Sequence, residues 1–231
     1  MIVYGKNSAK EVIIAKRHIY QVYLDHKFQD RSIFNLLEEH KINYKLVSKH
    51  ELNLLTNDGV HQGIVMEVKD YDYLSLEEMI SGNLKNILLL DKVSDPQNLG
   101  AIIRTSEAFK VDAIIIAKKG QTQITPLVSK IASGALEYIK IVLVDNLHRA
   151  VLKLKEANYL VIGSSLDATT TIKDLPKAEK RCLIVGSEGF GMSYLLKKES
   201  DVLIKIPMLG SVNSLNVSVA TGILIYELMN N

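Results

Sequence analysis

Several features typical of secreted, membrane or metal-binding proteins are scarce in this sequence of 231 residues. The only cysteine, Cys182, lies in the apolar run CLIVG and has no partner for a disulfide. This predicts a buried strand residue in a reducing compartment. The six histidines show neither H-x-x-H nor H-E-x-x-H spacing, and one cysteine cannot build a thiolate cage, so we expect no metal site.

Long apolar runs are also missing. Stretches such as Ile87–Leu90 and Ala113–Ala117 are far shorter than the ~18 residues that a membrane-spanning helix needs. The opening residues, MIVYGKNSAKEV, lack the charged segment and long apolar stretch of a secretory signal. With 47% hydrophobic and 23% charged residues, the composition is that of an ordinary globular protein. We therefore expect no membrane span and a cytoplasmic location.

An excess of charge of one sign is nearly absent as well, with 28 Lys and Arg residues against 26 Asp and Glu. The net charge is +2, so composition alone gives only a weak indication of a polyanionic partner such as a nucleic acid. Arginine is scarce, with five residues against 23 lysines. An arginine inside a polar motif is therefore a stronger functional candidate than another lysine, and Arg104 is such a residue.

The first part of the chain, residues 1–69, alternates short apolar stretches with amphipathic segments and predicts a small α/β domain. Two sequences have the capping-box spacing that begins a helix, Ser8-x-x-Glu11 and Ser48-x-x-Glu51. A further surface helix is indicated by the apolar and charged faces of the segment 33–39. The expected strands are 19–24, 44–47 and 63–68.

Residues 70–85 are predicted to form a linker and the first helix of the next domain. This stretch begins with tyrosines, Tyr71 and Tyr73, and contains a third capping box, Ser75-x-x-Glu78. Tyrosines in a linker can stack on RNA bases. More often they pack against the edge of a domain, and the sequence favours that interpretation.

Residues 86–231 predict a doubly wound α/β domain, because near-continuous apolar strands alternate with helical segments. The expected strands are 87–90, 113–117, 139–144, 160–163, 182–185 and 202–206. In such sheets ligands bind beyond the carboxyl ends of the strands. Three loops at those ends combine glycine with small polar residues, which suits close approach of the backbone to a ligand: 91–104, 186–193 and 207–218.

A nucleotide-binding oxidoreductase is one class that such loops could indicate. However, the glycines Gly186, Gly189 and Gly191 read G-x-x-G-x-G, whereas the dinucleotide fingerprint is G-x-G-x-x-G. The sequence also lacks the G-x-x-x-x-G-K-[ST] phosphate loop of kinases and NTPases. A third interpretation, in which each loop only joins a strand to a helix, is harder to sustain for all three loops together.

Three ordered motifs resemble those of the SpoU, or TrmH, family of RNA ribose 2′-O-methyltransferases. They are N-L-G-x-x-x-R in DKVSDPQNLGAIIRTSEAF, G-S-E-G-x-G in LIVGSEGFGMS, and S-L-N-V-S in IPMLGSVNSLNVSVATGI. The similarity spans most of residues 87–229. The segment 1–69, with YGKN at 4–7 and HQGI at 61–64, resembles the L30e-like RNA-binding domain of ribosomal members, although this match is weaker.

The resemblance implies a catalytic domain with a trefoil knot and a site for S-adenosylmethionine. Carried over residue by residue, it implies cofactor contacts at Gly186, Ile206 and Leu215, largely through backbone groups. It also implies a catalytic set around the reacting ribose hydroxyl, namely Arg104, Asn98, Glu188, Ser214 and Asn216. Because arginine side chains stay protonated in proteins, we assign to Arg104 the stabilisation of developing alkoxide charge and the binding of a neighbouring phosphate, rather than a role as a general base.

Each of these polar residues also has a structural alternative. Asn98 and Ser214 could cap helices, Glu188 could face a helix dipole, and Arg104 could be a solvated surface residue. For the whole chain, the leading hypothesis is methylation of a guanosine ribose in 23S ribosomal RNA. A transfer RNA substrate and a non-catalytic RNA-binding protein remain alternatives, as does, more distantly, an oxidoreductase. The final segment 217–228 is apolar on more than one face, and with the resemblance it predicts a homodimer.

Overall fold

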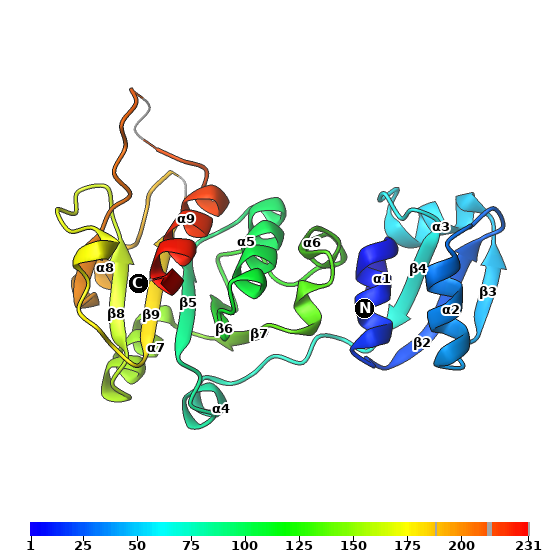
Figure 1. Ribbon diagram of the computed structural model, residues 1–231, viewed down its shortest axis with the longest axis horizontal. Coiled ribbons are helices and arrows are strands. Elements are labelled where there is room, and N and C mark those ends of the chain that lie inside the picture. Colours follow the sequence, from blue (N-terminus) through cyan, green and yellow to red (C-terminus); the bar gives the residue numbers. More distant parts are fainter. Residues whose placement is uncertain (188, 212–213, 231) are drawn as a thin grey trace. The chain divides into compact units, whose positions relative to one another are not determined.

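The computed structural model describes residues 1–187, 189–211 and 214–230 (Figure 1). The chain divides into two compact units. The first contains Met1–Asp72 together with Ile124–Tyr138, and the second contains Tyr73–Gln123 together with Ile139–Asn231.

The first unit is built on a four-stranded sheet in the order β1-β4-β2-β3. β2 (Ile19–Asp25) is antiparallel to β4 (Ile64–Val68) and parallel to β3 (Tyr44–Val47), and the short β1 (Ile2–Tyr4) completes the sheet beside β4. α1 (Lys6–Ile14) and α2 (Arg31–Glu39) bury apolar side chains in one core with the sheet, while α3 (Lys49–Thr56) packs in a smaller cluster through Leu52. The three predicted strands of this segment are confirmed, and β1 was missed.

Two of the three predicted capping boxes are present. Ser48 begins α3 and Ser75 begins α4 (Leu76–Ser81), each with the reciprocal bonds to a glutamate three residues later. The prediction for Ser8 was wrong, because α1 already begins at Lys6 after Gly5, whose φ of 90° favours glycine. Ser8 lies inside the helix, buried, and its hydroxyl donates to the backbone oxygen of Ser129 at 3.3 Å.

Ser129 belongs to a segment that sequence reasoning placed wholly within the 86–231 domain. This segment contains α6 (Pro126–Ala132) and the 3₁₀ turn η1 (Ala135–Glu137), and both belong to the first compact unit. Arg17 holds it by an ion pair with Glu137 at 2.9 Å, with side chains only 10% and 7% exposed. The segment's own periodicity carries no information about which unit it packs against.

The second unit contains a six-stranded sheet in which every strand pairing is parallel, in the order β10-β8-β9-β5-β6-β7. This confirms the predicted α/β class with a doubly wound parallel sheet. The strands are β5 (Asn86–Asp91), β6 (Ala113–Ala117), β7 (Lys140–Val144), β8 (Leu160–Ser164), β9 (Arg181–Gly186) and β10 (Val202–Ile204).

Helices cover both faces of this sheet. α4, α7 (Leu147–Glu156) and α8 (Tyr194–Glu199) share one apolar core with strand residues such as Leu89 and Ile184. α5 (Pro96–Ala108) packs beside α9 (Val217–Asn230), whose residues Ile225 and Leu228 lie with Leu88 on the other face. A short turn, η2 (Ile172–Asp174), follows β8.

Two predictions made from absences can be compared with this fold. Cys182 is fully buried in β9, which confirms the buried strand position, and burial raises the pKa of its thiol. Over the described ranges, no helix is both long and apolar enough to cross a membrane.

Candidate active site

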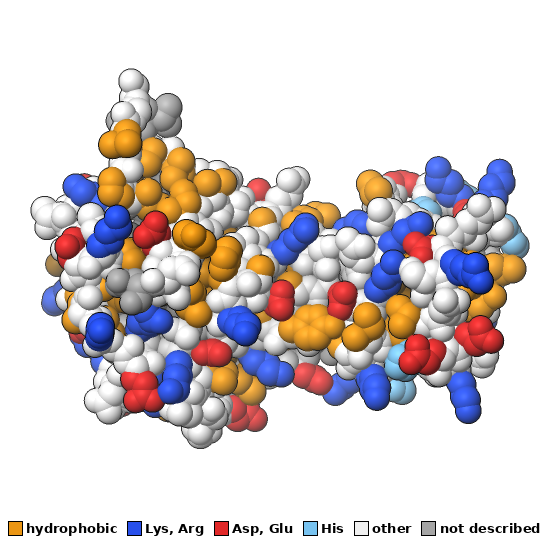
Figure 2. Space-filling view, in the orientation of Figure 1, with side chains coloured by type: hydrophobic (Ala, Val, Ile, Leu, Met, Phe, Trp, Pro, Cys, Tyr) orange, Lys and Arg blue, Asp and Glu red, His pale blue; other side chains and the backbone are white. Residues whose placement is uncertain are grey.

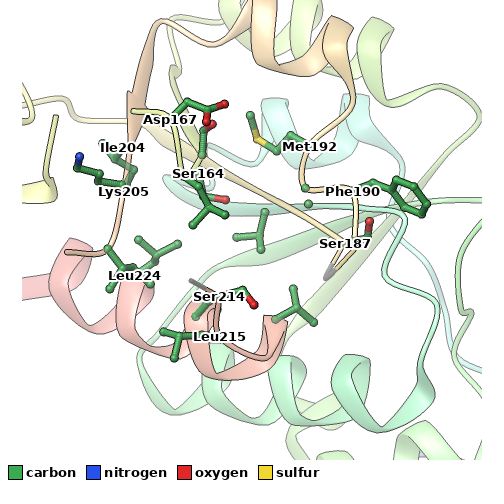
Figure 3. A pocket seen from close by; sticks show the side chains of 18 of the residues that line it. Ser164, Asp167, Ser187, Phe190, Met192, Ile204, Lys205, Ser214, Leu215 and Leu224 are labelled. Carbon is green, nitrogen blue, oxygen red and sulfur yellow. The ribbon is translucent and has the colours of Figure 1, made fainter. Parts of the chain in front are cut away.

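The carboxyl ends of three strands, β8, β9 and β10, surround a pocket of about 330 Å³ in the second unit (Figure 3). β5 and β9 are adjacent and parallel, with Asp91 opposite Gly186, so the loops that follow them leave the sheet side by side. β8 and then β10 flank β9 on its other side. The pocket is lined by the loop 164–167 after β8, the loop 186–192 after β9, the segment 204–208 after β10, and the start of α9 with the residues before it.

Gly186 forms a cradle at the base of the loop after β9. A Cβ atom at this position would lie 2.1–2.2 Å from the backbone of Gly191 and Met192, so no larger residue fits without moving the loop. Ser187 and Gly191 exchange two backbone hydrogen bonds, of 3.1 and 2.9 Å, which close the loop tightly. Gly191 has a φ of 63°, in the left-handed region.

Asp91 fixes the far end of the same loop. Its side chain is buried at 2% exposure, and its Oδ2 atom accepts a hydrogen bond of 2.6 Å from the backbone N–H of Ser193. The loops after β5 and β9 are therefore joined directly, by a charge-assisted bond. Sequence reasoning missed this role, although Asp91 ends a predicted strand and opens the first motif.

Asn98 and Asn216 are brought together from motifs that are 118 residues apart. The Nδ2 atom of Asn216 donates to Oδ1 of Asn98 at 3.0 Å, and Asn98 is only 6% exposed. The Oδ1 atom of Asn216 accepts from the backbone N–H groups of Ser218 and Val219, so Asn216 caps α9.

The capping alternatives for Asn98 and Ser214 were therefore wrong. Asp95 caps α5 through the N–H of Gln97 at 2.9 Å, which leaves Asn98 inside the first turn, where its side chain can reach α9. At α9, Asn216 takes the position that was considered for Ser214.

The predicted site residues fall into three groups in the structure. All three predicted cofactor contacts, Gly186, Ile206 and Leu215, line the pocket, and Ser214 lines it with them (Figure 3). Asn98 and Asn216 form the bonded pair described above, and Arg104 lies on α5. Glu188 falls outside the described residues.

Arg104 is not among the residues that line the pocket. Its side chain is exposed, and within the part of the chain that the structure describes it makes no hydrogen bond or ion pair. Arg104 is therefore a cation without a protein partner among the described residues, on the same helix as Asn98. This is expected of a residue that binds a phosphate only when RNA is present.

Chemically, the pocket fits a polar, nucleoside-bearing group such as S-adenosylmethionine. The hydroxyl oxygen of Ser187 is buried and has no hydrogen-bond partner among the described residues, so it is available to a bound molecule. The glycine cradle exposes backbone groups, and apolar side chains such as Ile206 and Leu215 offer surfaces for a flat ring.

One wall of the pocket was not predicted. The loop 164–167 follows β8, and its Asp167 pairs with Lys197 of α8 at 2.8 Å, which lowers the pKa of that carboxyl group. Its sequence has no glycine-rich motif, so only its place after a strand of a parallel sheet could have identified it. Within the ranges 1–187, 189–211 and 214–230, no group of three or more His, Cys, Asp or Glu residues could hold a metal ion.

Two family models match this chain, one over each part of it. Residues 2–74 match "RNA 2'-O ribose methyltransferase substrate binding", and residues 85–226 match "SpoU rRNA Methylase family". A protein of Staphylococcus haemolyticus, named in the TrmH family of tRNA/rRNA methyltransferases, is 34% identical over 235 residues, which cover 98% of this chain and 94% of the relative.

Solved structures show the same fold. The SpoU methyltransferase AviRb of Streptomyces viridochromogenes, in complex with AdoMet, has a TM-score of 0.85 at 20% identity, covering 100% of this chain and 89% of its own. An AdoMet-bound rRNA methyltransferase of Sinorhizobium meliloti has a TM-score of 0.81 at 22% identity, covering 99% of this chain and 86% of its own.

Proposed function

This chain belongs to the SpoU rRNA Methylase family, and from that premise we propose that it transfers a methyl group from S-adenosylmethionine to a ribose 2′-hydroxyl of structured RNA. The membership confirms the family and the enzyme class, RNA methyltransferase, that the sequence motifs predicted. The observation that carries the proposal is the pocket itself, where Gly186, at the end of β9, meets Ile206 and Leu215, from the segment between β10 and α9.

S-adenosylmethionine is the cofactor that this pocket supports best. Gly186, Ile206 and Leu215 would hold it, and the unpartnered Ser187 hydroxyl would donate to or accept from it. When bound, the cofactor supplies an activated methyl group. Two structural neighbours are described with AdoMet bound, which supports the same assignment here.

The reaction requires the ribose 2′-oxygen to attack the methyl carbon in line, as its proton leaves. Positioning supplies much of the rate of such a reaction. We assign Arg104 to the acceptor side, where its charged guanidinium stabilises the developing negative charge on the oxygen and holds an adjacent phosphate. Its exposed, unpaired side chain supports this role, because an RNA ligand can reach it.

The other polar residues are assigned by their place around this centre. The bond between Asn98 and Asn216 holds α5 against α9 and so sets the distance between the helix of Arg104 and the cofactor wall. Ser214, at the pocket wall, is proposed to contact the acceptor ribose. Glu188 keeps its proposed catalytic role on the strength of the motif alone.

For the substrate, we propose a guanosine of 23S ribosomal RNA, with residues 1–69 as the RNA-binding domain. The match of residues 2–74 to the substrate-binding family supports this domain. A transfer RNA is the second candidate, since the relatives are named for both RNAs. Incorporation of labelled methyl groups into 23S transcripts and into tRNA transcripts separates the two, and mapping of 2′-O-methyl sites in a deletion strain identifies the nucleotide.

We also propose a twofold-symmetric homodimer. Three apolar side chains of α9 repeat at helical spacing and remain exposed, Val219 at 51%, Ile223 at 37% and Tyr226 at 53%. The ring of Tyr226 meets that of Phe109, the residue directly after α5, with centroids 5.6 Å apart, which extends the apolar surface. Figure 2 shows hydrophobic side chains at the surface in this region. Light scattering that finds only a 25.8 kDa species at micromolar concentration would contradict the dimer.

The knot and the location complete the proposal. A trefoil knot at the carboxyl end is expected from the family, with the segments around Ile206 and Leu215 among its loops. A cytoplasmic location is proposed because the proposed RNA substrates are made and used there.

A further inference from the structure

Phe190 is the most exposed aromatic side chain near the pocket. It is 94% exposed, although it lines the pocket together with its loop neighbours. In Figure 3 its ring points away from the other labelled side chains, at the rim of the pocket. Exposing a phenyl ring to water is unfavourable, so a flat ligand that stacks on the ring would remove that cost.

The loop presents this ring on a rigid base. The two backbone bonds between Ser187 and Gly191 close the loop on either side of Phe190, and the bond from Ser193 to Asp91 anchors it to the neighbouring strand. Space around the ring is open, because the Phe190 side chain is almost fully exposed. A flat group can therefore approach the ring without displacing protein atoms.

The acceptor chemistry supplies such a group. In folded RNA a nucleotide presents its ribose to an enzyme pocket most readily when it leaves the stack, and the base then loses its stacking neighbours. Aromatic side chains replace those neighbours in many RNA-binding sites. Because Phe190 lines the pocket at its rim, a base stacked on its exposed ring would hold the ribose close to the mouth of the pocket and leave the interior to the cofactor.

We propose that Phe190 is the platform on which the base of the target nucleotide stacks while its ribose is methylated. This rests on the proposed function and adds a positioning residue to it. A phenyl ring has no hydrogen-bonding atoms, so it holds the base by its face and does not distinguish one base from another. Recognition of the base must then come from other groups.

The test compares four variants on a full-length 23S rRNA transcript and on tRNA transcripts. Phe190→Ala removes the ring, Phe190→Ile keeps apolar area without a flat face, and Phe190→Trp keeps the face. Tyr194→Ala is the matched control, because Tyr194 is an aromatic residue of α8, 77% exposed and outside the pocket lining. The measurements are kcat and KM for RNA, calorimetric affinity for S-adenosylmethionine, and molar mass by light scattering.

We expect kcat/KM for RNA to fall about 10-fold or more in the Ala and Ile variants, since one base stack contributes at least that factor. The Trp variant and the Tyr194→Ala control should stay within about 3-fold of the parent, and cofactor affinity and molar mass should not change in any of them. Parent-like activity in the Ala and Ile variants would overturn the proposal. Weaker cofactor binding in the Ala variant would also overturn it, because the ring would then contact the cofactor. So would a lower molar mass, because the ring would then lie between two copies of the chain. A folded parent protein that methylates neither RNA would instead contradict the proposed function on which this rests.

Discussion

The side-chain amide of Asn216 donates to the side-chain oxygen of Asn98 at 3.0 Å and thereby joins the first turn of α5 to the start of α9. Asn98→Ala removes the acceptor. We expect it to lower the free energy of unfolding by about 1 kcal/mol, because the hydrogen bond from the Asn216 amide is lost. Asn216→Ala also removes the cap of α9, which adds about 1 kcal/mol.

Denaturant unfolding of both single variants and the double variant measures this pair. The double variant should be less destabilised than the sum of the singles, since the shared bond is lost only once. Asn35→Ala, an exposed position on α2, serves as the control with little expected change. Strict additivity of the two single effects would show that the bond contributes nothing.

Gly186 provides a second prediction, with a glycine outside the pocket lining as its control. Gly186→Ala places a methyl group 2.1 Å from the Gly191 backbone, so the loop must move, and the affinity for S-adenosylmethionine should fall at least about 10-fold. Gly222→Ala lies on α9 outside the pocket lining, and its methyl group would meet Thr105 at an ordinary contact distance of 3.5 Å, so its cofactor affinity should match the parent. Calorimetry measures the affinity of both variants for S-adenosylmethionine. Equal affinities would show that Gly186 does not form part of the cofactor site.

Arg17 and Glu137 form the buried ion pair that holds η1 within the first unit. Burial raises the pKa of Glu137, and the neighbouring Arg17 opposes that shift. Arg17→Ala leaves a buried carboxylate without its cation and should cost about 3–5 kcal/mol of stability at neutral pH. A double variant, Arg17→Met with Glu137→Gln, should lose less.

The pH dependence gives this pair a signature. When a carboxyl group has a higher pKa folded than unfolded, it favours folding while protonated, and this contribution disappears as the pH rises through the folded pKa. Arg17→Ala raises that pKa further, so its destabilisation should be smaller at pH 5 than at pH 8. An equal loss of stability at pH 5 and at pH 8 would mean that Glu137 stays unprotonated at both pH values in the folded variant.

Asp30 responds to pH in the opposite sense. A hydrogen bond from the Ser32 hydroxyl, with support from Lys6 and the backbone N–H of Ile33, lowers its pKa to about 2. Its stabilising effect is therefore present above the unfolded pKa of about 3.9 and is lost as the pH falls toward 2. Asp30→Asn keeps a capping oxygen without the charge, so its stability difference from the parent should shrink between pH 5 and pH 2. Thermal unfolding between pH 5 and pH 2 measures this difference in stability. A difference that stays constant would show that the charge of Asp30 does not contribute to stability.

The capping boxes show how far local sequence signals reach. Ser48 and Ser75 begin helices as predicted, because both partners of a capping box lie within three residues. Ser8 has the same spacing but lies inside α1, which begins at Lys6, and its hydroxyl donates to the backbone oxygen of Ser129, 121 residues away. Strand positions were likewise predictable from apolar runs, except for the three-residue β1, which is too short to show a pattern.

At the site, too, the sequence predicted local features but not the contacts between distant segments. Glycine motifs at strand ends predicted which loops meet, and Gly186, Ile206 and Leu215 do line one pocket. The pairing of Asn98 with Asn216 and the anchoring of Ser193 by Asp91 depend on how distant segments pack, so no local pattern contains them. The wall at 164–167 has an ordinary loop composition, and only the sheet topology identifies it.

The central claim is that Arg104 serves the transfer of a methyl group to RNA, and one measurement tests it most directly. Initial rates of labelled methyl incorporation into the RNA substrate are compared for the parent, Arg104→Ala and Arg104→Lys, with calorimetric cofactor affinity and thermal unfolding measured on the same preparations. Because Arg104 lies outside the pocket lining and is exposed, cofactor affinity and stability should match the parent. Turnover should fall about 10²–10³-fold in the alanine variant, and lysine should restore it only in part, since an ammonium cannot make the two-pronged contact to phosphate. A folded, cofactor-binding Arg104→Ala protein that methylates RNA at the parent rate would contradict the account.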